Sequence, residues 1–346
     1  MGRSRFPVWL TLTLMLASWS PTLHVTRGPT AALAWAEAPA DPADSRFLAG
    51  QLVDGLHAVF GEHAGARAAH AKGIVLEGRF KPSRAATAVS KAPHLQGPPV
   101  PVTVRFSAFS GLPTIADSDA LSAPRGLAVK FTLPNGAETD IVAHSLNGFP
   151  SATAADFRDL LMATAKSGPQ AAPPTALDTY LEKHPVAKAT LSRPQPVPVS
   201  YATQPYFAVN AFKFTNARKK IVYGRYRLLP AAGAHYLSAE QVTRAAPDFL
   251  GDELRRRMRR GPVKFTLALQ LAQASDNLND PSIPWPESRR LITLGVISLA
   301  RVVPNQAAAD KALLFLPSAV TAGIQPQDPM INARSNSYVV SFERRQ

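Results

Sequence analysis

Residues 128–143 read Ala-Val-Lys-Phe-Thr-Leu-Pro-Asn-Gly-Ala-Glu-Thr-Asp-Ile-Val-Ala, and this stretch contains the clearest fold signal in the chain. Its central dipeptide, Asn135-Gly136, favours the tight turns of β-hairpins. The residues before the turn, Val129-Lys130-Phe131, and those after it, Asp140-Ile141-Val142, are strand-like. The stretch therefore predicts two antiparallel strands joined by a hairpin.

Further strand-like runs lie on both sides of this hairpin. The first group comprises Ile74–Phe80, Val100–Phe109, Ala128–Leu133 and Thr139–Ala143, and the second comprises Phe207–Phe214, Lys220–Leu228, Pro262–Ala274 and Ile292–Val303. Helical spacing of apolar residues marks Leu48–Phe60, Asp156–Thr164 and Thr175–His184. This order predicts an α+β fold, in which a closed antiparallel barrel of about eight strands carries helical additions.

The composition is that of a globular protein with ample apolar material for a core. The chain has 346 residues, of which 46% are hydrophobic and 18% charged, with no cysteine and a formal net charge of +14. The lack of thiols excludes disulfide and thiol chemistry. The densest basic run, Arg255–Arg260, follows two acidic residues in a predicted helix and lacks interleaved aromatic residues. We expect it to be a solvated helix face, and we expect no nucleic-acid partner.

The first residues have the pattern of a secretory signal peptide. Arg3 and Arg5 precede an apolar run, Phe6–Trp19, and small residues at positions 32, 34 and 36 offer cleavage sites. A retained membrane anchor is the alternative, but the run is shorter than the roughly 20 residues that span a bilayer. We expect residues 1–36 to be removed, residues 37–346 to form a single domain, and the mature protein to be periplasmic or secreted without stable membrane insertion.

His70 is a candidate acid–base residue, because a neutral imidazole can take up and return a proton near neutral pH. A single histidine that follows a helix is more often structural, so its role depends on its neighbours. Ser107, in the stretch Val104-Arg105-Phe106-Ser107, offers a hydroxyl group that would fix the tautomer of the imidazole. The sequence therefore predicts a contact between His70 and Ser107.

Several motifs, taken in order along the chain, resemble the haem catalases and more closely the short catalase-related peroxidases. The matching segments are Arg67–Gly73, Arg105-Phe106-Ser107, Pro124–Phe131, Asn279-Asp280-Pro281, Trp285-Pro286 and Leu294-Gly295. The match extends from about Leu48 to Arg345. The resemblance implies a catalase-like barrel, haem b as the cofactor, and His70 as the catalytic residue on the distal side of the haem.

The resemblance also implies which residues lie on the proximal side of the haem. Tyr338 is implied as the axial ligand of the iron. Arg334 precedes it by four residues, so both side chains share one face of a helix, where the cation stabilises the phenolate.

Arginines are implied to bind the haem propionates, since a guanidinium suits a carboxylate. The family's pattern assigns this role to Arg67, Arg105 and Arg345, with Arg344 as an equally available neighbour of Arg345. Phe149 and Phe157 are candidates to flank the macrocycle, with plain core packing as the alternative.

Two features depart from the large catalases. Those enzymes have an Asn-Asn-Thr-Pro segment in which one asparagine helps to polarise peroxide, whereas this chain has His144 and Ser145 at the asparagine positions and Asn147 two residues later. Asn147 is the candidate for that catalytic role. The chain also stops eight residues after Tyr338. We therefore expect the C-terminal helical domain of the large catalases, and its long channel, to be missing.

These features together predict a haem-dependent peroxidase of oxidative-stress response. We expect it to reduce hydrogen peroxide, and organic peroxides as a further class, with electrons from an organic donor, and to have weak catalase activity. A monomer or homodimer is expected. Three alternatives stay open: an allene oxide synthase-like rearrangement of hydroperoxides, a non-enzymatic haem carrier or sensor, and a haem-free lipid-binding barrel. A carrier needs no distal base, which disfavours that alternative.

Overall fold

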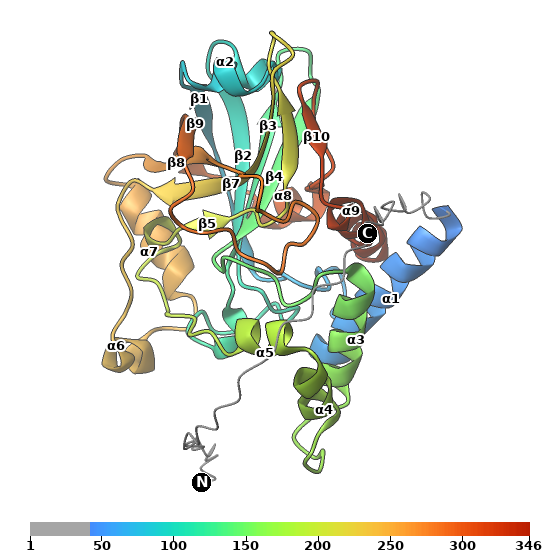
Figure 1. The fold of residues 1–346 in the computed structure, drawn as a ribbon. Helices are drawn as coiled ribbons and strands as arrows, with labels where there is room; N and C mark the ends of the chain where they lie inside the picture. The colour runs from blue at the N-terminus through green and yellow to red at the C-terminus, as the bar shows by residue number, and fades with distance from the viewer. Residues whose placement is uncertain (1–41) are drawn as a thin grey trace, which may run out of the picture. The chain divides into compact units, whose positions relative to one another are not determined.

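Eight antiparallel strands form a closed barrel in the computed structural model, which describes residues 42–346 (Figure 1). Around the barrel the order is β7, β5, β4, β3, β2, β1, β9 and β8, and pairing of β8 with β7 closes the ring. The strands are β1 (Gly73–Pro82), β2 (Val100–Ser107), β3 (Gly126–Thr132), β4 (Glu138–His144), β5 (Tyr206–Phe207), β7 (Ile221–Pro230), β8 (Val263–Leu271) and β9 (Leu291–Val302). The predicted fold class is confirmed. The predicted signal peptide, residues 1–36, lies outside the described residues.

The predicted hairpin joins β3 to β4. Val129 pairs with Ile141 in its register, and the N–H of Gly136 donates to the carbonyl of Leu133 at 2.9 Å. Gly136 has a φ of +79°, a conformation that glycine adopts without the steric cost of a Cβ. The Asn-Gly signal therefore identified the turn correctly.

The prediction of one continuous strand over residues 207–214 is wrong. The segment instead forms β5 and a separate strand, β6 (Phe212–Thr215), which both pair with the same edge of β7. Between them the chain leaves the ladder at Asn210, whose amide side chain forms hydrogen bonds with Asp328 and Arg334 near the C-terminus. A tenth strand, β10 (Ile324–Pro326), pairs with β6. Side-chain hydrogen bonding by Asn210 thus accompanies the break in the strand.

Aromatic and aliphatic side chains fill the barrel. Phe106 of β2, Tyr206 of β5 and Phe265 of β8 are all buried, and their ring centroids lie 5.8 to 6.0 Å apart. Burial of one such side chain contributes on the order of 1.5–3 kcal/mol. The interior is therefore a packed core at this level.

Three helices pack together beside the barrel, as Figure 1 shows: α1 (Pro42–Phe60), α3 (Ala154–Ala165) and α9 (Met330–Arg344). Leu52 of α1, Leu161 of α3 and Met330 of α9 belong to one buried apolar cluster. The remaining helices are α2 (Ala86–Val89), α4 (Ala176–Lys183), α5 (Pro185–Leu191), α6 (Ala239–Arg244), α7 (Phe249–Met258) and α8 (Gln306–Ala312), with short 3-10 turns at Pro93–Leu95, Ala120–Ser122 and Tyr201–Thr203. Within residues 42–346, no helix has the length and apolar character needed to cross a membrane.

The basic run predicted on a helix lies in the last turn of α7 and just beyond it. Cations are favourable there because the carbonyls at a helix C-terminus carry partial negative charge. Arg255 pairs with Asp252 at 3.3 Å, and Arg257 pairs with Glu253 at 2.8 Å. These are ion pairs within the helix.

Candidate active site

His70 lies in the loop between α1 and β1, in a left-handed backbone conformation with a φ of +58°. Two backbone hydrogen bonds hold this loop against the segment after β2: the N–H of His70 donates to the carbonyl of Phe109 at 2.7 Å, and that of Ala71 donates to Ser110 at 3.0 Å. The neighbouring Lys72 forms an ion pair with the buried Asp117 at 2.8 Å. The loop around His70 is therefore fixed on both sides.

The predicted contact between His70 and Ser107 is confirmed, since Nδ1 of His70 lies 2.9 Å from Oγ of Ser107. Gly126, which pairs with Ser107 across β2 and β3, leaves the space for the imidazole. A Cβ at Gly126 would come within 2.5 Å of the serine oxygen and 2.9 Å of the histidine Nδ1. Any larger residue there would displace the imidazole or the hydroxyl.

His144 is a second imidazole on the same side of the barrel. It pairs with Gly126 across β3 and β4, and Gly126 pairs in turn with Ser107, so the three residues form one row across three strands. Directly paired residues point to the same face of a sheet. Both ring nitrogens of His144 are buried and lack a side-chain hydrogen-bond partner among the described residues. Sequence analysis noted the residue but did not place it in the site.

Burial keeps both imidazoles neutral. Desolvation lowers the pKa of His70 to about 3, and the positive charge of Arg105 acts in the same direction. Burial, with a contribution from Arg334, likewise lowers the pKa of His144 to about 3. Each imidazole is therefore uncharged at neutral pH.

The C-terminal helix α9 supplies the second group of candidate residues. Nη2 of Arg334 donates to the phenol oxygen of Tyr338 at 2.7 Å, as their spacing predicted. The second terminal nitrogen of Arg334, Nη1, donates to Oδ1 of Asn210, and Nδ2 of Asn210 donates to the buried Asp328 at 2.7 Å. A chain of hydrogen bonds thus runs from Asp328 to Tyr338. Sequence analysis missed Asn210 and Asp328, because their side chains meet only in the fold.

Three predicted arginines converge on α8. Nε of Arg105 donates to Asp310, Nη2 of Arg67 lies 3.2 Å from the same carboxylate, and Arg345 donates to backbone carbonyls of α8 and the residue that follows it. Arg344 points elsewhere and pairs with Asp54 at 2.6 Å. The fold thus separates Arg345 from Arg344, which the sequence left as equals. Asp310 was not identified from the sequence.

The remaining predicted residues lie at the edge of this arrangement. The rings of Phe149 and Phe157 are 4.8 Å apart, and Phe149 also lies 6.5 Å from the ring of His144. The amide nitrogen of Asn147 donates to Glu287 at 2.7 Å. The proposed roles of these residues in binding haem or peroxide stay predictions. The amide of Asn147 is already engaged by Glu287.

In a comparison with protein families, the model for catalase matches residues 49–345 of this chain. This match agrees with the order of the candidate residues along the chain and with the barrel that carries them. The chain belongs to the catalase family. A catalase-related peroxidase of Mycolicibacterium paratuberculosis is 37% identical over 85% of this chain and 94% of its own length. Another, from Synechococcus elongatus, is 30% identical over 85% of this chain and 88% of its own length.

Solved catalase structures share the fold of this catalase-family chain. A fungal catalase superimposes with a TM-score of 0.72 at 23% identity, and catalase A of Saccharomyces cerevisiae superimposes with the same score at 21% identity. Each match covers 82% of this chain but only 60% and 62% of the two catalases. At these identities the likeness shows the fold.

Members of the catalase family bind haem, and the residues of this chain fit that cofactor. Haem carries two carboxylates, while three arginines and one aspartate leave an excess of two positive charges at α8. The Nε atoms of Arg67 and Arg345 are buried without a hydrogen-bond partner among the described residues. Buried donors of this kind require acceptors. Two propionates would supply both the acceptors and the missing negative charge.

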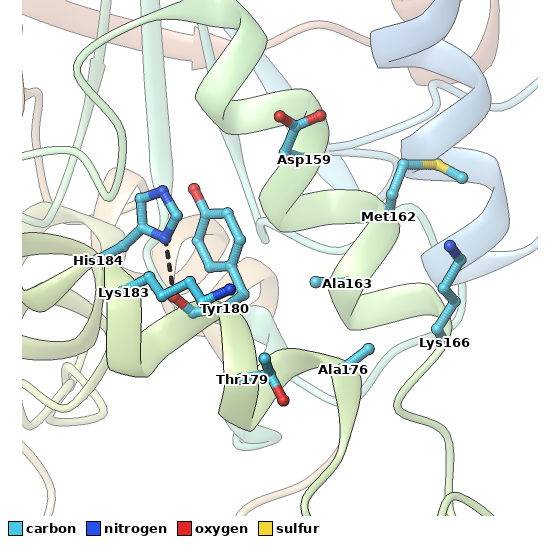
Figure 2. Close-up of a pocket in the computed structure, with 9 residues that line it drawn as sticks. All are labelled: Asp159, Met162, Ala163, Lys166, Ala176, Thr179, Tyr180, Lys183 and His184. Carbon is cyan, nitrogen blue, oxygen red and sulfur yellow. Dashed lines mark hydrogen bonds between the residues drawn. The ribbon is translucent and has the colours of Figure 1, made fainter.

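A separate hollow of about 310 Å³ opens between α3 and α4 (Figure 2). The rings of Tyr180 and His184 stack on one side of it, with centroids 3.8 Å apart, and Met162 and Lys166 lie on the other side. None of the predicted site residues lines this hollow. It is therefore distinct from the candidate active site.

Proposed function

We propose that this catalase-family oxidoreductase is a haem b peroxidase that reduces hydrogen peroxide with electrons from an organic donor and releases oxygen only as a weaker side reaction. One observation carries the proposal: a neutral, buried imidazole fixed by a serine, His70, occurs in the same fold as a phenol held by an arginine, Tyr338. The first suits proton transfer, and the second suits iron ligation.

The chain would hold the cofactor through two sets of residues. Tyr338 would ligate the iron as a phenolate, stabilised by the hydrogen bond from Arg334. Arg67, Arg105 and Arg345 would bind the propionates. The haem would supply the redox chemistry, and the protein would supply binding, orientation and proton transfer.

His70 would move the proton during reduction of the peroxide. Its Nδ1 is engaged by Ser107, so Nε2 is the free nitrogen. Nε2 accepts the proton from one peroxide oxygen and returns it to the other, which leaves as water when the O–O bond breaks. For each peroxide, two electrons and two protons from the donor side are consumed and two waters form.

We further propose that His144, rather than Asn147, provides the second polar contact to peroxide. Its ring nitrogens are buried and free of side-chain partners, whereas the amide of Asn147 is engaged by Glu287. A neutral imidazole donates from one nitrogen and accepts at the other, so it can serve where the large catalases have an asparagine.

The test begins with haem-reconstituted protein. A pyridine haemochrome spectrum identifies the haem type, and peroxide is then added in an oxygen electrode with and without a phenolic donor. We expect donor oxidation and a fall in oxygen release that is proportional to donor concentration. Vigorous oxygen release that the donor does not suppress would identify a true catalase, and no reaction would identify a carrier. Product analysis with a fatty-acid hydroperoxide tests the allene oxide synthase-like alternative.

Export is a proposal of its own, supported by Arg3, Arg5 and the apolar run Phe6–Trp19. N-terminal sequencing of protein from the periplasm or the medium tests it, with a mature start near Glu37 as the expected result. Full-length protein that stays with the membrane would contradict cleavage.

A further inference from the structure

Asp310 is the carboxylate shared by two of the three candidate propionate-binding arginines. Among the described residues, Arg67 and Arg105 each form a salt bridge with Asp310 and with no other acidic side chain. The side chain of Arg105 is 4% exposed and that of Arg67 is 15% exposed, whereas Asp310 is 32% exposed. One partly exposed carboxylate therefore organises two more deeply buried cations.

The contacts fix the orientation of both guanidinium groups. Oδ1 of Asp310 accepts from Nε of Arg105 and from Nη2 of Arg67, and Oδ2 accepts from Nη2 of Arg105 at 3.2 Å. Arg105 is thus bound at two nitrogens, which sets the plane of its guanidinium. Gly73 makes room for this plane, because a Cβ there would lie 2.5 Å from the central carbon of the guanidinium.

The C-terminal end of α8 adds backbone acceptors. The carbonyls of Asp310 and Leu313 accept from Nη2 of Arg67 at 3.0 and 2.8 Å, and the same two carbonyls accept from Arg345 at 3.0 and 2.7 Å. Carbonyls at a helix C-terminus lack partners within the helix and attract cations. Asp310 therefore stands at the one place where all three arginines meet.

Electrostatics explains why a carboxylate is needed there. Burial and the charge of Arg105 lower the pKa of Arg67 to about 9, and Asp310 opposes this shift. Burial alone would raise the pKa of Asp310, but Arg105 and Arg67 hold it below its usual value, so the carboxylate is ionised. Without that charge, the cations would repel one another and turn toward solvent.

We propose that Asp310 is a positioning residue, which orients Arg67 and Arg105 so that their remaining N–H groups bind the carboxylates of haem. The inference rests on the proposed function. The Nη1 atoms of Arg67 and Arg105 form no hydrogen bond with the described residues, so their N–H groups are left for an external carboxylate. In a competing model, Asp310 and the propionates compete for the same N–H donors. That model predicts that haem dissociates more slowly from Asp310→Asn than from the wild type.

The experiment compares haem with haem dimethyl ester, whose propionates are methylated and uncharged. Dissociation rates of both from the wild type and from Asp310→Asn are measured by transfer to apomyoglobin. We expect haem to dissociate about 10- to 100-fold faster from Asp310→Asn, the usual range for loss of a supporting residue. We expect the ester to dissociate at the wild-type rate within about twofold. Asp310→Glu should restore part of the retention of haem.

Asp276→Asn is the matched control. Asp276 forms a comparable arginine pair, at 2.9 Å with Arg289, and its side chain is less exposed than that of Asp310, but it lies outside the candidate site. It should leave both dissociation rates unchanged. Thermal unfolding of the haem-free variants shows whether each one is folded.

Three outcomes would overturn the inference: unchanged retention of haem in Asp310→Asn, tighter retention, or equal loss of haem and ester. The first two leave wild-type binding intact and so refute only the positioning role. A wild type that retains no haem would overturn the proposed function and the inference together.

Discussion

The proposed distal and proximal sides of the candidate site differ in how their polar groups are bonded. On the distal side, the ring nitrogens of His144 have no side-chain partner among the described residues, and only Nδ1 of His70 is engaged. On the proximal side, hydrogen bonds connect Asp328, Asn210, Arg334 and Tyr338 without a gap. Nε2 of His70 is left for a group that exchanges protons, whereas the hydrogen bonds on the other side hold the phenol oxygen of Tyr338 in place.

This contrast separates reactivity from binding. A group that must gain and lose a proton needs a free nitrogen and a neutral resting state, and burial supplies the neutral state for His70. A ligand that must stay bound needs a fixed direction, and the hydrogen bond from Arg334 fixes the phenol oxygen of Tyr338, the proposed ligand. Substitutions on the two sides should therefore change different measurements.

The largest effect is expected for His70→Ala. Loss of a general acid–base group slows the reaction with peroxide by roughly a hundred- to ten-thousand-fold, while haem binding is retained. Stopped-flow mixing of the reconstituted variant with peroxide measures the rate. A loss of less than tenfold would mean that another group moves the proton, with His144 the first to test.

Tyr338→Phe should act on binding instead of rate. Removal of the proposed iron ligand should weaken haem retention by more than about 100-fold, because loss of a supporting residue alone costs about 10- to 100-fold. The variant should also lose the ferric phenolate absorption. Tyr236→Phe, at an exposed tyrosine outside the site, is the control. A phenolate spectrum that survives in Tyr338→Phe would refute the ligand assignment.

Interruption of the proximal chain should give smaller, graded losses. Arg334→Ala removes the donor to the phenol, and we expect haem to dissociate about 10- to 100-fold faster. Asn210→Ala leaves that donor in place but frees it to rotate, so its effect should lie near tenfold. Wild-type retention of haem in Asn210→Ala would show that Arg334 is held by other contacts.

The last prediction concerns acid stability of the haem-free protein and involves no change in haem chemistry. An unfolded histidine takes up a proton below about pH 6.5, whereas burial lowers the pKa of His144 to about 3. The unfolded state therefore binds more protons, and stability falls as the pH drops from 6.5 toward 3. Between pH 6.5 and pH 5, the free energy of unfolding should therefore fall by about 2 kcal/mol less in His144→Phe than in the wild type.

Urea unfolding at both pH values measures the difference. Burial also lowers the pKa of His94, to about 4, so His94→Leu should change the pH dependence with the same sign. Identical pH dependence in the wild type and in His144→Phe would contradict the buried, neutral state of His144.

Local signals predicted most of the fold. Asn135-Gly136 identified the hairpin of β3 and β4, and helical spacing placed α1, α3 and α4. Residues 207–214 were wrongly predicted to form one strand. The alternation of apolar and polar residues does not show that Asn210 interrupts the strand pairing and bonds a residue far away in the sequence. Asn210 bonds Asp328, which is 118 residues away in the sequence.

The sequence by itself determined the barrel and the family and named the candidate site residues, because strand alternation, turn chemistry and short motifs depend on neighbouring positions. Only the tertiary structure decided which polar groups meet. In the fold, Arg345 contacts α8, whereas Arg344 contacts Asp54. Asp310 lies between two arginines, and the ring nitrogens of His144 have no side-chain partner among the described residues. Hydrogen bonds and ion pairs act over a few ångströms in space, and separation along the chain carries no information about such distances.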